Sequence, residues 1–132
     1  KAGYKEIHKD LYLVPIEIGQ VVRLNNVFFD FDKATLREES FVELDRVVKL
    51  LNDNPTIEID MGAHTDNKGS DDYNMKLSSS RAQSVMEYIL SKGIAENRIQ
   101  SHGYGETKPV VENDTDENRQ LNRRVEFTII KN

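Results

Sequence analysis

The chain has 132 residues, of which 37% are hydrophobic and 31% charged, and these values are typical of one globular domain rather than of a disordered chain. Its 18 basic and 23 acidic side chains give a net charge of −5, which argues against a nucleic acid partner, and the absence of cysteine excludes disulfides and thiolate chemistry. No apolar run approaches the roughly 18 residues needed to cross a bilayer.

The first third of the chain predicts a lead-in segment followed by a strand and a helix. Residues 1–25 mix apolar and charged side chains, which indicates an extended lead-in with short strands, and residues 26–132 are expected to form the domain. The aromatic run at 27–32 predicts the first core strand. Thr35 and Glu38 have the spacing of a capping box, which predicts that a helix begins there and ends before Pro55.

The remaining elements follow from alternation and helical periodicity. Residues 56–62 alternate as a strand, residues 64–72 are a polar loop, and an apolar stripe from Leu77 to Leu90 predicts a helix that ends near Gly93. Residues 98–104 predict a short strand, 105–122 a long polar loop, and 125–129 a final strand. The expected fold class is α+β, a two-layer sandwich with a β-α-β-α-β-β core, a mixed sheet and both helices on one face.

Arg81 is the most informative single residue because it stands in a row of the second helix that otherwise points at the core. It lies four residues after Leu77 and four before Val85. An unpaired buried charge costs roughly 3 to 5 kcal/mol, so Arg81 either meets a carboxylate, protein or ligand, or extends along the helix edge into solvent. Periodicity alone leaves both interpretations open.

Thr65 and Asp66 follow the second predicted strand, at the kind of loop where binding groups gather. If Asp66 and Arg81 share a pocket, they suit an amino acid head group, because a carboxylate accepts hydrogen bonds from an ammonium and a guanidinium grips a carboxylate through two parallel bonds. An internal salt bridge or an Asx-turn by Asp66 explains the same residue. Spacing does not decide between these alternatives.

Five motifs surround these residues: Phe29-Asp30-Phe31-Asp32-x-x-x-x-Leu36, His64-Thr65-Asp66, Tyr73-Asn74-x-x-Leu77-Ser78-x-x-Arg81-Ala82-x-x-Val85, Gly103-Tyr104-Gly105 and Asn122-Arg123-Arg124-Val125-Glu126. With these motifs the sequence resembles a known family, the OmpA-like peptidoglycan-binding domain, over about residues 27–130.

The resemblance implies non-catalytic, non-covalent binding of the peptidoglycan peptide stem, which would anchor an outer-membrane or envelope protein to the cell wall in the periplasm. The free end of meso-diaminopimelate would be held by Asp66 and Arg81. By the same positional match, further ligand-binding residues are Asp32, Thr65, Asn74 and Arg124.

Other chemistries lack their residue patterns, so we expect no enzyme activity, no metal and no cofactor. The three histidines have no zinc spacing, the acidic run at 114–118 lacks the glycine of a calcium loop, and no nucleophile elbow surrounds Ser78. Arg123 and Arg124 suit either a phosphate ligand or sheet-edge pairing with Glu126, and the sequence leaves both interpretations open. The alternatives kept open are a cell-wall hydrolase and an interaction domain for a peptide carboxylate.

The sequence gives less information about the parent protein and its cellular location. Because it starts at Lys1 and has no signal-peptide pattern, we expect a segment of a longer protein, with any export signal or membrane anchor outside it. Contact with a membrane is therefore expected only through those other parts. Whether the domain forms a homodimer is left open by the sequence.

Overall fold

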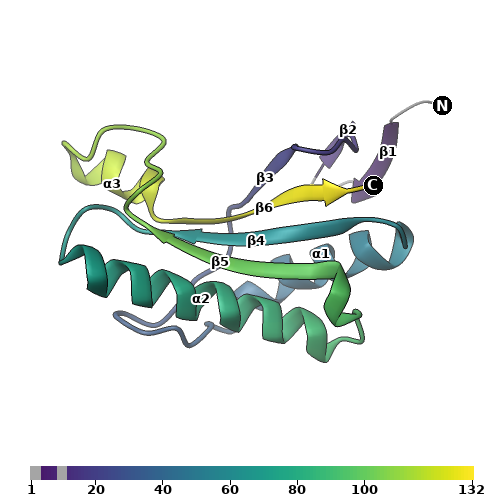
Figure 1. Ribbon diagram of the computed structural model, residues 1–132, viewed down its shortest axis with the longest axis horizontal. Helices are drawn as coiled ribbons and strands as arrows, with labels where there is room; N and C mark the ends of the chain where they lie inside the picture. Colours follow the sequence, from purple (N-terminus) through teal and green to yellow (C-terminus); the bar gives the residue numbers. More distant parts are fainter. Residues whose placement is uncertain (1–3, 9–11) are drawn as a thin grey trace.

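The computed structural model describes residues 4–8 and 12–132 of the chain (Figure 1). Three short strands precede the first helix, and strands and helices then alternate up to the last strand. In chain order the elements are β1 (Tyr4–His8), β2 (Tyr12–Pro15), β3 (Val21–Leu24), α1 (Ser40–Asp53), β4 (Glu58–His64), α2 (Asp71–Ser91), the 3₁₀ turn η1 (Glu96–Arg98), β5 (Ile99–Gly105), α3 (Asp116–Asn122) and β6 (Arg124–Lys131).

The main sheet has four strands in the order β3-β6-β4-β5 and is mixed. β6 pairs antiparallel with both β3 and β4, whereas β4 and β5 are parallel. Helices α1 and α2 lie together on one side of this sheet, and the short α3 lies at one end of it (Figure 1). β1 and β2 form a separate two-stranded sheet. The predicted α+β class and the mixed sheet are confirmed, and the main sheet follows the predicted β-α-β-α-β-β order except that α3 stands between β5 and β6.

Side-chain alternation explains why the two helices cover only one face. On β4 and β6 the apolar residues that point toward the helices are buried, and most of the residues between them carry charged or polar groups. The helix α1 adds a stripe at helical spacing. The central core residues are Leu44, Val47, Leu51, Ile57, Ile59, Met61, Val85, Ile89, Phe127 and Ile129.

The prediction of a first core strand at 27–32 is wrong, because the first strand of the main sheet is β3. The segment between β3 and α1 has only one isolated bridge, Phe29 to Leu36. Phe31 is 91% exposed, and Asp32 has a φ of +64°, which no extended strand accommodates. The aromatic run is therefore a loop in which the Phe31 ring faces solvent. Leu11, one of the apolar residues expected in the lead-in, lies outside the described residues.

Two helix boundaries also differ from the sequence prediction. The first helix begins at Ser40 rather than at Thr35, because the Ser40 hydroxyl binds the backbone N–H and C=O of Phe28 and fixes the chain direction there. The second helix begins earlier than its apolar stripe, at Asp71, where the hydroxyl of Ser70 accepts a hydrogen bond from the Tyr73 N–H.

Helix α3 lies within the segment for which the sequence predicts a polar loop. The hydroxyl of Thr115 caps this short helix by accepting a hydrogen bond from the N–H of Asn118. Seven residues with only one buried member give no apolar stripe, so periodicity offers no signal for it. Thr115, a favourable N-cap residue, is the feature of the sequence that indicates a helix here.

The packing of α2 on β5 depends on a missing side chain at Gly103. A Cβ placed there would lie 2.1 Å from the backbone N of Ser79 and 2.5 Å from its Cα. Helix backbone atoms cannot move independently to relieve a clash, whereas the end of a flexible side chain can rotate away. Any side chain at this position therefore forces the helix away from the sheet. Gly103 therefore sets the distance between α2 and the strand beneath it.

We predict that Gly103→Ala lowers the free energy of unfolding by about 1 to 3 kcal/mol, the usual cost of overpacking. The matched control is Gly62→Ala, whose added Cβ would meet the ring of Tyr104 at 3.0 Å, a contact that ring rotation relieves. Urea denaturation of both variants tests this. A Gly103→Ala protein as stable as the Gly62→Ala protein would contradict the close approach.

Candidate functional site

A cavity of about 500 Å³ opens where the loop between β3 and α1 faces the adjoining ends of β4 and β6. Its floor includes Ala63 and Val125 from the two strands, and Phe28 and Phe29 from the loop. Arginines dominate its polar lining, whereas Glu39 is the acidic lining residue. The five lining arginines are Arg23, Arg37, Arg81, Arg123 and Arg124. Such a lining favours an anionic ligand.

Arg81 reaches this cavity from α2 and is held by uncharged partners. Its Nε donates to the carbonyl of Lys33 at 2.8 Å, its Nη2 donates to the carbonyl of Asp30 at 3.4 Å, and its guanidinium lies 4.7 Å from the centre of the Phe29 ring. Burial lowers the pKa of Arg81, and the charge of Asp32 opposes that shift. Within the described part of the chain, no carboxylate lies at ion-pair distance from it.

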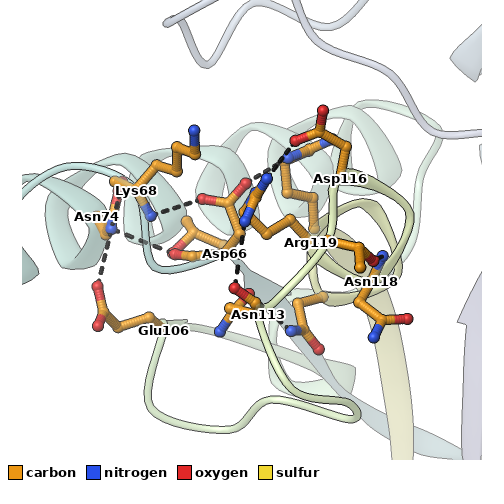
Figure 2. Close-up of polar contacts among 12 residues, drawn as sticks. Asp66, Lys68, Asn74, Glu106, Asn113, Asp116, Asn118 and Arg119 are labelled. Atoms are coloured by element: carbon orange, nitrogen blue, oxygen red, sulfur yellow. Dashed lines mark hydrogen bonds and ion pairs between the residues drawn. The ribbon is translucent and has the colours of Figure 1, made fainter.

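Asp66 is 7% exposed and is fixed by contacts on both carboxylate oxygens (Figure 2). Oδ1 accepts the backbone N–H of Lys68 at 2.9 Å, which is an Asx-turn, and Oδ2 forms an ion pair with Arg123. Both structural explanations left open by the sequence are therefore present together. Arg123 also lines the cavity, so it joins the buried Asp66 to the space that Arg81 faces.

Thr65 and Asn74 hold the loop that carries Asp66. The hydroxyl of Thr65 donates to the Asp66 carbonyl at 2.8 Å. The side-chain amide of Asn74 lies within 3.3 Å of that same carbonyl, and it also donates to the Lys68 carbonyl and to the carboxylate of Glu106 (Figure 2). As far as the described residues show, the cavity lining includes neither Thr65 nor Asn74.

The last two predicted site residues, Asp32 and Arg124, are both engaged with other residues of the protein. Asp32, in the loop after β3, accepts a hydrogen bond from the hydroxyl of Tyr73 on α2. Arg124 is 8% exposed and lines the cavity, but its Nε lies 2.9 Å from Glu126 and its Nη2 donates to the carbonyl of Lys108 at 2.9 Å. With a further bond from Nη1 to the carbonyl of Asn122, three of the five donors of Arg124 are used inside the protein.

Sequence reasoning assigned no binding role to three arginines of the cavity, Arg23, Arg37 and Arg123. Of the two alternatives left open for Arg123, the pairing with Glu126 is not formed, because Arg123 lies at the C-cap of α3 and pairs with Asp66; of the two arginines, Arg124 pairs with Glu126. The alternation of a strand contained this signal, because residues 124 and 126 share a face that residue 123 does not. For Arg37 the sequence carried no comparable indication.

Glu126 belongs to a polar cluster beside the cavity, on the sheet face away from the helices. The Nε2 of His64 lies 3.4 Å from Oε2 of Glu126, and the His64 ring stacks on Tyr104 at 5.0 Å. Contact with His64 lowers the pKa of Glu126 most, burial opposes the shift, and Arg124 adds to the lowering; together they place that pKa at about 2, against an ordinary value of 4.5.

Two other kinds of site have no candidates in the described part of the chain. Among the residues that the structure describes, no group of three or more histidine, cysteine, aspartate or glutamate side chains could hold a metal ion. None of the described helices is both long enough and apolar enough to cross a membrane.

Comparisons with known sequences identify a family for most of the chain. A family model described as the OmpA family matches residues 28–123. Outer membrane protein A of Bordetella avium is 44% identical over 112 residues, which cover 85% of this chain and 58% of that protein. Outer membrane porin F of Pseudomonas fluorescens is 38% identical over 113 residues, which cover 85% of this chain and 35% of that protein. The chain therefore spans only part of the length of these relatives.

Solved structures share the fold. A MotB-like protein from Desulfovibrio vulgaris has a TM-score of 0.76 and 28% sequence identity, with 85% of this chain and 73% of that chain covered. The cell wall anchor of the T6SS from Pseudomonas aeruginosa has a TM-score of 0.72 and 29% identity, with 85% and 80% covered.

The low pKa of Glu126 predicts a defined pH dependence. A depressed carboxyl pKa stabilises the folded chain fully above about pH 4.5, and this contribution is lost as the pH falls toward about 2. Glu126→Gln should therefore be less stable than the wild type at pH 7, and the difference should shrink across that acidic range. Urea denaturation from pH 7 to pH 2 measures it. A difference that stays constant with pH would contradict the assignment.

Proposed function

The chain belongs to the OmpA family, and from this premise we propose that it binds the peptide stem of peptidoglycan through meso-diaminopimelate. It would thereby anchor an outer-membrane or envelope protein to the cell wall, in the periplasm. The observation that carries the proposal is Arg81, a half-buried cation at a cavity whose contacts are two carbonyls and an aromatic face rather than a carboxylate. The likeness to a solved cell wall anchor supports the anchoring role.

Arg81 supplies the recognition of the ligand carboxylate in this proposal. Diaminopimelate differs from lysine by one additional carboxylate at the far end of its side chain, next to an ammonium. A guanidinium binds a carboxylate through two parallel hydrogen bonds, and those bonds are stronger than bonds to neutral carbonyls because both groups are charged. The carbonyls of Lys33 and Asp30 occupy these donors without neutralising them. A ligand carboxylate can therefore displace them with a net gain.

Asp66 supplies the complementary charge for the ammonium of the ligand. An ionised carboxylate has about four lone-pair positions, and the two contacts found here, from Lys68 and Arg123, use half of them. Because Asp66 is buried, an ammonium placed beside it interacts in a medium where charge–charge attraction is stronger than in water. Arg123 is 47% exposed and can turn outward when the ammonium binds.

Specificity follows from the same pair of charges. A stem that carries lysine in place of diaminopimelate has the ammonium without the adjacent carboxylate, so it would desolvate Arg81 and leave it without a charged partner. The site would therefore discriminate between the two stems mainly through the free-energy cost of desolvating Arg81 without giving it a charged partner. Affinity for one stem is expected to be modest, and attachment to a polymer of stems gains strength when several domains bind at once.

Calorimetry with purified muropeptides tests the proposal against its alternatives. Binding of diaminopimelate stems, no binding of lysine stems and no turnover by chromatography are the expected results. Loss of substrate would instead support the cell-wall hydrolase. Equal binding of unrelated peptides with a free carboxylate, not displaced by free diaminopimelate, would support the interaction domain.

We predict that Arg81→Ala and Asp66→Asn each weaken binding of the diaminopimelate stem by about 2 kcal/mol or more, roughly thirtyfold. The asparagine side chain of the second variant keeps an oxygen for the N–H of Lys68, so the turn survives while the charge is removed. The control is Arg46→Ala, an arginine of α1 that pairs with Glu43 and does not line the cavity. Both site variants should unfold cooperatively; wild-type retention of either on purified sacculi would contradict the site.

Arg81→Lys separates charge from geometry. Lysine keeps the positive charge but presents a single ammonium, which cannot form the two parallel bonds of a guanidinium. We expect most of the loss seen in Arg81→Ala to persist in this variant when titrated with the same stem. Wild-type affinity of Arg81→Lys would show that the site reads charge alone.

A further inference from the structure

The cavity is larger and more cationic than the tip of a diaminopimelate side chain requires. Its volume of about 500 Å³ lies in the range of sites that enclose a drug-sized ligand, whereas the tip consists of one ammonium and one carboxylate. Under the proposed function Arg81 binds that carboxylate. Four further arginines line the same space, so part of the cavity is suited to a second anionic group.

The further arginines differ in how firmly the protein already holds them. Arg124 is buried between Glu126 and the carbonyl of Lys108, and Arg123 is paired with the buried Asp66. Arg23 has interactions of its own. These three side chains are engaged inside the protein.

Among the residues that the structure describes, the ionic partners of the Arg37 side chain are exposed carboxylates. Its Nε lies 3.4 Å from Oε2 of Glu39, and its Nη1 lies 4.0 Å from Oδ1 of Asp30; all three side chains are about half exposed. Exposed ion pairs at such distances contribute little to stability. Arg37 can therefore exchange these partners for a ligand carboxylate at little cost.

Asp30 links Arg37 to Arg81 in space. The carboxylate of Asp30 meets the guanidinium of Arg37, while the carbonyl of the same residue accepts a bond from Arg81. The two guanidinium groups thus contact different parts of one residue at the wall of one cavity. A ligand that reaches both guanidinium groups can present one carboxylate to each.

Resting on the proposed function, we propose that Arg37 forms a second anion subsite, which binds the α-carboxylate of the γ-linked glutamate that precedes diaminopimelate in the stem. The glutamate α-carboxylate and the tip carboxylate lie at opposite ends of one γ-glutamyl-diaminopimelate unit, so a single ligand offers one carboxylate to each arginine of the cavity. Arg81 reads the diaminopimelate carboxylate and Arg37 reads the glutamate carboxylate. The ligand is then recognised as a dipeptide unit rather than as a single side chain.

Glu39 competes with the ligand carboxylate for Arg37, so a substitution of Glu39 provides a second, independent test of this subsite. Its carboxylate lines the cavity and competes with the ligand for Arg37. Glu39 stands at the N-cap of α1, but its side chain makes no capping hydrogen bond. Replacing it with glutamine therefore removes the competing charge without removing a cap, and should strengthen the interaction that Arg37→Gln weakens.

The test compares two tripeptides by calorimetry: alanyl-γ-glutamyl-diaminopimelate, and the same peptide with the glutamate α-carboxylate amidated. We expect the wild type to prefer the free carboxylate by about fivefold, near the upper end for an exposed ion pair. The preference should vanish in Arg37→Gln and increase in Glu39→Gln. Arg46→Gln, which changes an arginine outside the cavity, should keep the wild-type preference.

The outcomes separate this inference from the function on which it rests. Equal affinity of the wild type for both tripeptides, or an unchanged preference in Arg37→Gln, overturns the second subsite and leaves the diaminopimelate site standing. Failure of the wild type to bind either tripeptide overturns the proposed function and the subsite with it. Arg37 keeps its backbone hydrogen bond to the Phe28 carbonyl in the variant, so thermal melting should show an intact fold.

Discussion

The structure depends on one electrostatic constraint, a half-buried guanidinium that the protein surrounds with neutral groups. Arg81 emerges from a helix whose neighbouring positions are core, and it meets two carbonyls and the ring of Phe29. Carbonyl dipoles and an aromatic face lower the cost of burying the charge, yet they leave its net charge in place. Burial lowers the pKa of Arg81, as expected for a charge that is partly removed from water. The cavity beside it is where a counter-charge would be accommodated.

The rest of the fold holds that charge at a fixed place. Gly103 lets α2 approach β5 until backbone nearly meets backbone, so the helix that carries Arg81 has little freedom to shift. The loop that faces it is tied to both helices, through the Ser40 hydroxyl on α1 and the contact between Asp32 and Tyr73 on α2. Binding groups are positioned well when the elements behind them are rigid.

Much of the fold was predictable from sequence, because a strand or helix that buries one face has apolar residues at a regular spacing along the chain. β4, β6 and the stripe of α1 were evident for this reason. The loop at 27–32 was not, since a run of aromatic residues predicts a strand whether its rings point inward or, like Phe31, into solvent. The short helix α3 was not predicted, because its seven residues are too few to show a helical repeat of apolar side chains.

The candidate site was less predictable, because its members are set by tertiary contacts. Sequence singled out Arg81 as a charge in a core row, but which arginine would meet Asp66 depended on the turn between α3 and β6. Arg123 forms the ion pair with Asp66, and Arg124 forms an ion pair with Glu126. The internal partners are themselves informative: Asp66 with Arg123, and Arg37 with Glu39, already pair the kinds of charge that a zwitterionic ligand would bring. A ligand that replaces such pairs exchanges one set of ionic contacts for another, so binding of this kind is readily reversible and selective for charge geometry.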